Sequence, residues 1–177
     1  MTAISTRSRA ETGLPLRHLL GAARNQRGQG VDETRSISLC GEIRDDVHHL
    51  TQRVYYEDTD FSGAVYHARY LHFMERARTD YLRCLGVEQS GLFETSDEGL
   101  AFMVHRMEID FKAPARMDDI VTILTRTEKA GGAKMVLQQE IRRSEQLLIS
   151  AKVVIAVVNR NGRPRRLPED LARQFLG

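Results

Sequence analysis

The sequence predicts one α+β domain in which a five-stranded antiparallel sheet wraps around a single long helix. Three observations predict it. A wide apolar stripe at helical spacing runs through residues 67–85. Several other segments are β-branched or alternate between apolar and polar residues, as strands do. Short turns join the later segments, which favours hairpins, and hence an antiparallel sheet with a segregated helix.

The first strand is expected at residues 47–56, which end in Val54, Tyr55 and Tyr56. β-Branched and aromatic residues of this kind are typical of strands. The letters EDTDFSG follow as residues 57–63. Small and acidic residues that end in a glycine indicate a turn.

The long helix is expected from about His67 to Leu85. Its apolar residues step by four, three, four and four through Tyr70, Met74, Ala77, Tyr81 and Leu85, and Leu71, Phe73 and Leu82 widen the stripe. A stripe of this width predicts a helix largely covered by other structure. Gly86 stands where a C-terminal glycine is favoured, so the helix should end there.

The later segments change from helical to alternating period. Residues 87–99 are polar and predict a short helix or loop, and strands are expected at 107–112, 120–127, 134–142 and 147–158. The last is apolar on both faces in its second half, which is typical of a central strand. A short helix is expected at 167–176, with Pro168 at its start. A curved sheet around one helix is the hotdog arrangement, with a generic α+β sandwich as the alternative.

Composition excludes several function classes. The 177 residues fit one domain, and a formal net charge of +2 lacks the basic excess of a nucleic-acid binder. The longest apolar run, residues 153–158, is far shorter than the ~20 residues of a membrane-spanning helix. The two cysteines, Cys40 and Cys84, form no CxxC pair or disulfide framework. A reducing, cytoplasmic compartment is therefore expected.

The first part of the chain differs from the rest. Residues 1–31 hold five arginines and one acid, and residues 25–30 read NQRGQG, as a flexible linker would. We expect residues 1–46 to be a disordered extension and residues 47–177 to be the domain. A transit peptide, or residues upstream of the true start, are alternatives.

Three acids, Glu57, Asp58 and Asp60, lie directly before the long helix. A helix N-terminus offers free N–H groups and a partial positive charge, where a developing negative charge can be stabilised. Gly63 lets the backbone approach a ligand closely, and a carboxylate nearby can act as nucleophile or general base. His67 could orient water or bind a carbonyl oxygen. The same acids are, however, common caps worth about 1 kcal/mol, so spacing alone leaves both roles open.

The block YYEDTDFSGAVYHARYLHFMERAR, residues 55–78, resembles the signature of the acyl-CoA thioesterases associated with the Tol-Pal system. These belong to the wider 4-hydroxybenzoyl-CoA thioesterase group, which has the hotdog fold. The resemblance continues through MEIDFKAPARMDD at residues 107–119 and spans about residues 47–170. Residues 1–46 lie outside it.

The resemblance implies roles for residues of this block. Asp60, the second aspartate of EDTD, corresponds to the catalytic carboxylate. His67 corresponds to the active-site histidine, at a helix start whose amide polarises the thioester carbonyl. Tyr56 corresponds to a residue that lines the same site, and we expect it to be one of the catalytic residues. Gly63 and Val65 are expected to contact the substrate. Phe61 and Ser62, where the family varies, are expected to shape the acyl pocket.

Other residues of the sequence could form different sites. Glu75 corresponds to the catalytic glutamate of a related branch, but with EDTD present we expect it to form structural ion pairs with Arg76 and Arg78. His48 and His49 have no cysteine or carboxylate at metal-ligand spacing, so no metal site is expected. No GxSxG elbow supports a serine esterase. The arginines of residues 159–166 could contact coenzyme A phosphates or simply lie in a solvated loop.

The resemblance implies hydrolysis of acyl-CoA thioesters to free acid and coenzyme A, without a metal or cofactor. It also implies a homo-oligomer, a dimer or tetramer, with active sites between subunits. We expect a cytoplasmic homotetramer. Peripheral association of this protein with the inner membrane is an alternative. The alternative is a binding module for acyl carrier protein or lipid-synthesis enzymes at that membrane. A hotdog dehydratase is a third possibility, but its histidine–carboxylate motif is not found.

Overall fold

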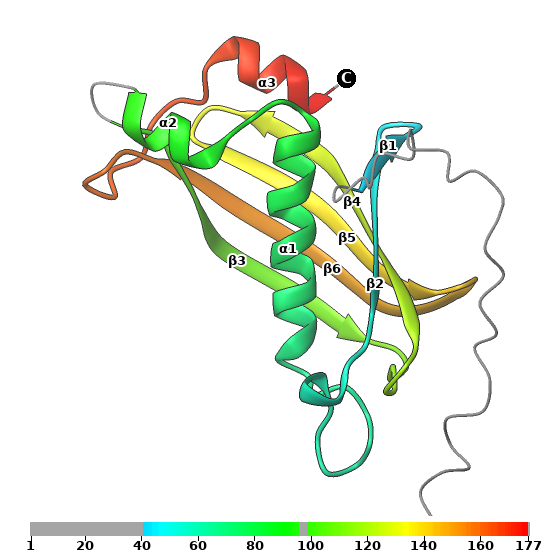
Figure 1. Ribbon diagram of the computed structural model, residues 1–177. Helices are drawn as coiled ribbons and strands as arrows, with labels where there is room; N and C mark the ends of the chain where they lie inside the picture. Colours follow the sequence, from blue (N-terminus) through cyan, green and yellow to red (C-terminus); the bar gives the residue numbers. More distant parts are fainter. Residues whose placement is uncertain (1–40, 96–98, 177) are drawn as a thin grey trace, which may run out of the picture. The chain divides into compact units, whose positions relative to one another are not determined.

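The computed structural model describes residues 41–95 and 99–176 (Figure 1). The strands are β1 (Glu42–Arg44), β2 (Val47–Arg53), β3 (Ala101–Phe111), β4 (Ile120–Gly131), β5 (Lys134–Arg143) and β6 (Gln146–Val158). The helices are the 3-10 turn η2 (Tyr56–Asp58), α1 (Arg69–Cys84), α2 (Gln89–Thr95) and α3 (Glu169–Leu176). No helix among these described residues is both long enough and apolar enough to span a membrane.

All described strands form one antiparallel sheet in the order β1-β2-β4-β5-β6-β3. β6 lies between β5 and β3, so its predicted central place is confirmed. The long helix α1 lies across one face of this sheet (Figure 1). The hotdog fold expected from the sequence is therefore confirmed.

The sheet has six strands, so the expected count of five was wrong. The added strand β1 lies within residues 1–46, and residues 1–40 of that segment are outside the described residues. β1 pairs with β2 through a tight turn in which Asp45 (φ 49°) and Asp46 (φ 61°) both adopt the left-handed conformation. Turns of this type match the twist of paired strands.

The core forms between α1 and the sheet. The helix buries one side against strands β2, β4, β5 and β6, through Tyr70, Phe73, Met74, Ala77, Tyr81 and Leu82. The helix ends as predicted, because Gly86 takes φ +76° and its N–H bonds to the Arg83 carbonyl at 2.9 Å. This packing fixes the N-terminal end of α1, where the candidate site lies.

Candidate active site

Asp58 is the buried acid of the turn between β2 and α1. Its Oδ2 accepts the Tyr55 N–H at 2.8 Å, and its Oδ1 lies 3.3 Å from Nε of Arg69. Its carbonyl accepts the N–H of Tyr66 at 2.9 Å. These contacts hold the end of β2 against the first turn of α1. Asp58 is therefore a structural residue, which is the capping role that spacing had left open.

Asp60 is exposed and lies on the loop that follows η2. Its Oδ1 accepts hydrogen bonds from Oγ of Ser62 at 2.6 Å and from the Ser62 N–H at 2.8 Å. These two bonds, in that order, lower the pKa of the Asp60 carboxyl, and a smaller lowering comes from the charge of His67. Asp60 therefore presents an ionised carboxylate to solvent at neutral pH.

The loop carrying Asp60 is closed on itself and tied to the sheet end. Asp60 donates its N–H to the Ala64 carbonyl at 3.0 Å and accepts the Gly63 N–H at 2.9 Å. Gly63 has φ +73°, a backbone conformation that residues other than glycine rarely adopt. Val65 in turn donates its N–H to the Ala115 carbonyl at 2.9 Å. The backbone thus positions Asp60 without burying its side chain.

A pocket of about 300 Å³ opens beside this loop. Val65, His67 and Tyr70 line it from the start of α1, and residues 111–114 line it from the end of β3. The His67 ring is exposed and lies 4.4 Å from the Tyr66 ring, centre to centre. The pocket is mainly apolar, with the imidazole at its edge, and its lining suits an acyl chain.

The first turn of α1 leaves backbone donors available. The helix begins at Arg69, two residues after the predicted start, and its N-cap Ala68 provides no side-chain cap. The N–H groups of His67, Ala68 and Tyr70 have no acceptor in residues 41–95 and 99–176. Such donors can stabilise negative charge on a carbonyl oxygen.

The structure brings the predicted residues together only in part. Val65 and His67 line the pocket, while Asp60 and Gly63 lie on the adjoining loop. The charge of His67 contributes to the lowered pKa of Asp60. Tyr56, also predicted in the site, is 80% exposed and is not among the residues that line the pocket.

Among the described residues Glu75 has no ion-pair partner, so that expectation was wrong, although its charge acts to raise the pKa of Arg78. Within the described chain, its Oε1 accepts a hydrogen bond from Thr79 at 2.8 Å, and it forms no ion pair with Arg76 or Arg78. Arg78 instead donates to Oε1 of Gln139 at 2.9 Å, and burial lowers the pKa of its guanidinium.

Arg160, in the arginine-containing segment at residues 159–166, has a structural role. Arg160 donates to the carbonyl oxygens of Phe93, at 2.8 and 3.0 Å, and of Glu94, at 2.9 Å. Its guanidinium also lies 5.4 Å from the centre of the Phe93 ring. Arg160 therefore holds the end of α2, and its guanidinium is already used in these contacts, which argues against a contact with the phosphates of coenzyme A.

Sequence reasoning missed Tyr70 as a site residue. Its hydroxyl accepts the Ala115 N–H at 2.8 Å, and burial raises the pKa of its phenol. This bond joins the first turn of α1 to the segment that forms the far wall of the pocket. The helical stripe marked Tyr70 only as a core residue. A polar tip on such a residue is the signal that could have indicated a partner.

The chain is similar in sequence to several known proteins. The sequence profile of the Thioesterase superfamily matches residues 62–150. An acyl-CoA thioesterase, YbgC, of Haemophilus influenzae is 42% identical over 124 residues, which cover 70% of this chain and 90% of the relative. The acyl-CoA thioester hydrolase YbgC of Escherichia coli O157:H7 is 41% identical over 125 residues, covering 70% and 91%.

A solved structure adds evidence on the fold. The crystal structure of a probable thioesterase from Bartonella henselae superposes with a TM-score of 0.66 at 47% identity. The match covers 69% of this chain and 99% of that one. The hotdog-domain part of the chain, rather than the whole, is therefore what these proteins share.

Proposed function

We propose, from the premise that this chain belongs to the thioesterase superfamily, that it hydrolyses acyl-CoA thioesters to free acid and coenzyme A. The family match and the acyl-CoA thioesterase names of its relatives support the reaction class. The single observation that carries the proposal for the site is the arrangement at the start of α1. An ionised carboxylate lies on a loop next to unpaired helix amides and an apolar pocket.

The proposed reaction uses these parts in sequence. The acyl chain occupies the pocket beside Val65, and the thioester oxygen accepts from the free N–H groups near His67. Asp60 then either attacks the carbonyl carbon or takes a proton from an attacking water. In both routes the carbon–sulfur bond breaks and coenzyme A leaves as a thiol after taking up a proton. The amides stabilise the oxyanion, an effect worth roughly 3 kcal/mol per donor.

The two routes differ in where water oxygen ends up. Attack by Asp60 forms a mixed anhydride, whose hydrolysis can place the oxygen of water in the aspartate itself. General-base catalysis places it only in the released acid. Single turnover in ¹⁸O-water, followed by mass spectrometry of the Asp60 peptide, distinguishes them. Label in Asp60 supports the nucleophilic route.

We propose that the working site includes a second copy of this chain. Three aromatic residues beside the site are largely exposed in the single chain: Tyr55 at 61%, Tyr56 at 80% and Phe61 at 109%. Exposed aromatic rings next to a shallow pocket favour burial against a partner of the same sequence. Light scattering after gel filtration tests this. A monomer at working concentration would contradict it, and a dimer or tetramer would support it.

The test of the reaction is turnover of a panel of acyl-CoA thioesters. Wild-type protein should hydrolyse members of the panel, and Asp60→Asn should lower kcat by roughly 10²–10⁴-fold. Glu57→Gln is the matched control, because it removes an acid from the same turn whose side chain is 71% exposed. Absence of wild-type turnover would overturn the reaction class. Full activity of Asp60→Asn would overturn the role of that residue alone.

The link to the Tol-Pal system and to acyl carrier protein is a further part of this proposal, supported by the resemblance of residues 55–78. Purified Asp60→Asn keeps the protein surface while removing the proposed chemistry. Retention of acyl carrier protein on that variant in a pulldown would support a binding partnership in addition to hydrolysis. No retention with either form would contradict it.

A further inference from the structure

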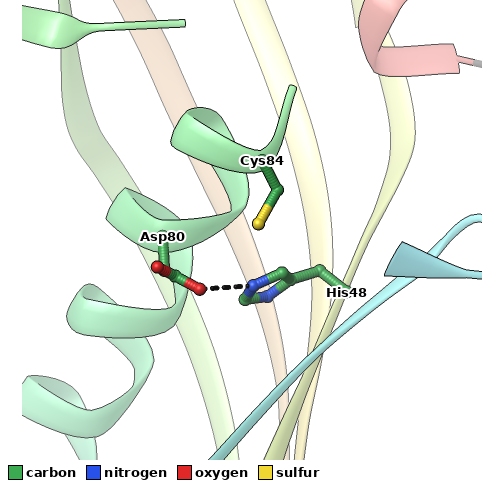
Figure 2. Close-up of side chains that lie close together, drawn as sticks. All are labelled: His48, Asp80 and Cys84. Atoms are coloured by element: carbon green, nitrogen blue, oxygen red, sulfur yellow. Dashed lines mark hydrogen bonds and ion pairs between the residues drawn. The ribbon is translucent and has the colours of Figure 1, made fainter. Parts of the chain in front are cut away.

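A cluster of three potential metal ligands lies at the other end of α1 from the candidate active site. His48 comes from β2, and Asp80 and Cys84 come from the last turns of α1. One donor atom of each residue, a nitrogen, an oxygen and a sulfur, lies within 4.8 Å of the others. Figure 2 shows the three side chains converging from the strand and the helix. The helix contributes its pair because residues four apart share one face.

The cluster is buried and its imidazole is incompletely satisfied. His48 is 0% exposed, and its Nε2 lies 2.8 Å from Oδ2 of Asp80 (Figure 2). The other ring nitrogen, Nδ1, is buried and has no hydrogen-bond partner in the described part of the chain. The Cys84 thiol lies beside this pair and adds a sulfur to the nitrogen and oxygen donors.

Gly41 lies directly against this cluster. Its N–H donates to Oδ2 of Asp80 at 2.6 Å, and its carbonyl accepts from Sγ of Cys84 at 3.4 Å. A Cβ at this position would come within 2.6 Å of Nε2 of His48. The glycine therefore lets the backbone approach the three side chains, and its carbonyl adds an oxygen at the edge of the group.

We propose that His48, Asp80 and Cys84 bind a divalent transition-metal ion, with Zn²⁺ the best match. Nitrogen, carboxylate oxygen and thiolate form a mixed donor set that zinc accepts, whereas Mg²⁺ and Ca²⁺ require oxygen ligands. Zn–N and Zn–O bonds of about 2.0–2.1 Å and a Zn–S bond of about 2.3 Å place tetrahedral donors roughly 3.3–3.6 Å apart. Separations from 2.8 Å to at most 4.8 Å reach that geometry by small side-chain rotations.

The proposed ion stabilises the fold and takes no part in hydrolysis. Asp80 is twelve residues beyond the N-cap Ala68, a distance of roughly 18 Å along the helix axis. An ion held by His48 and Cys84 would join β2 to the end of α1. Water or the Gly41 carbonyl would complete four-coordination. Binding requires the Cys84 thiol to lose its proton to solvent, so uptake releases about one proton per ion.

The test uses the full chain without an affinity tag, reduced and stripped of metal by chelation. Calorimetric titration with Zn²⁺ should show one ion per chain, with heats in two buffers that report proton release. At about a hundredfold excess of free Zn²⁺ over Kd, the Tm should rise by roughly 5–10 °C. Co²⁺ should give a thiolate charge-transfer band in the wild-type protein, a readout that depends on no variant.

Two substitutions test the proposed ligands, and two further substitutions serve as controls. Cys84→Ala and Asp80→Asn should each weaken Zn²⁺ binding at least tenfold and abolish or reduce the Tm shift. His49→Gln is the matched control, since it removes the neighbouring histidine of the same strand and should leave binding unchanged. Cys40→Ser removes the only other thiol of the chain and should also leave it unchanged.

Three results with the wild-type protein or its variants would overturn the proposal. Absence of Zn²⁺ binding and of a Co²⁺–thiolate band in wild-type protein would do so, as would unchanged binding by a folded Cys84→Ala variant. Loss of binding in Cys40→Ser with retention in Cys84→Ala would also overturn it, because the site would then lie elsewhere. Circular dichroism of each metal-free variant shows that it is folded before titration.

Discussion

Ser62 donates two hydrogen bonds to one oxygen of Asp60, from its hydroxyl at 2.6 Å and from its backbone N–H at 2.8 Å. The pair are two residues apart in a loop that the Gly63 conformation helps to close. Both bonds favour the charged form of the carboxyl and lower its pKa from the ordinary value of 3.8. Ser62 therefore orients the carboxylate and keeps it ionised, although it is not among the residues that line the pocket.

We expect Ser62→Ala to move the acidic limb of the kcat/KM profile toward higher pH. Loss of the hydroxyl removes the largest cause of the lowered pKa, so Asp60 is protonated, and inactive, at a higher pH. The lowered pKa of Asp60 also stabilises the folded wild-type protein at pH values above the pKa that Asp60 has in the unfolded chain. This stabilisation is lost as the pH falls through the pKa of Asp60 in the folded protein. The measurement is kcat/KM across about pH 3–7. Thr59→Val, whose hydroxyl bonds to Tyr56 instead, is the control, and an equal shift in it would contradict the argument.

Asp58→Ala should lower the free energy of unfolding by about 2–3 kcal/mol. The substitution leaves the Tyr55 N–H without its acceptor and the partly buried Arg69 guanidinium without its nearest charge. Urea denaturation followed by circular dichroism measures the change. Glu57→Ala should alter stability by no more than about 0.5 kcal/mol, because its contact with Arg69 is exposed and 3.7 Å long. Equal effects of the two variants would show that Asp58 is not structural.

The long helix and the four later strands could be predicted because hydrophobic periodicity reports burial directly. β1 could not, since all three of its residues, EIR, are exposed and its place depends on pairing with β2. Residue spacing alone could not show that Asp58 is buried and Asp60 exposed, because this depends on which carboxylate the backbone turns inward. Contacts between distant residues, such as Arg78 with Gln139, carry no local pattern, so ion pairing with nearby Glu75 was the wrong expectation.

Gln139→Leu should destabilise the protein by about 2–4 kcal/mol. Gln139 is 1% exposed, accepts from Arg78 at 2.9 Å and donates to the buried Thr125 hydroxyl at 2.9 Å. Leucine matches its size but leaves a largely buried guanidinium without an acceptor. The measurement is chemical denaturation at neutral pH. Gln138→Leu removes only an exposed bond to Glu128 and should cost about 0.5 kcal/mol or less, so a comparable loss there would contradict the prediction.

Tyr70→Phe should raise KM for acyl substrates and lower stability by about 1–2 kcal/mol, with little change in kcat. The hydroxyl is the acceptor for the Ala115 N–H at 2.8 Å, and Ala115 is fully buried. Without it the segment that forms one wall of the pocket loses its tie to α1, while Asp60 and the helix amides stay in place. Because the phenol pKa is raised by burial, Tyr70 keeps its proton, and the effect should be independent of pH across the neutral range.

The matched control for this last change is Tyr81→Phe. Tyr81 lies on the same helix, is also buried, and its hydroxyl makes a 3.1 Å bond to Thr127 at the far end from the pocket. Its loss should cost stability by a similar amount and leave KM unchanged. Steady-state kinetics on one acyl-CoA, beside thermal denaturation of both variants, separates the two effects. If both variants raised KM equally, the Tyr70 bond would matter only for stability, and the wall it holds would not define the pocket.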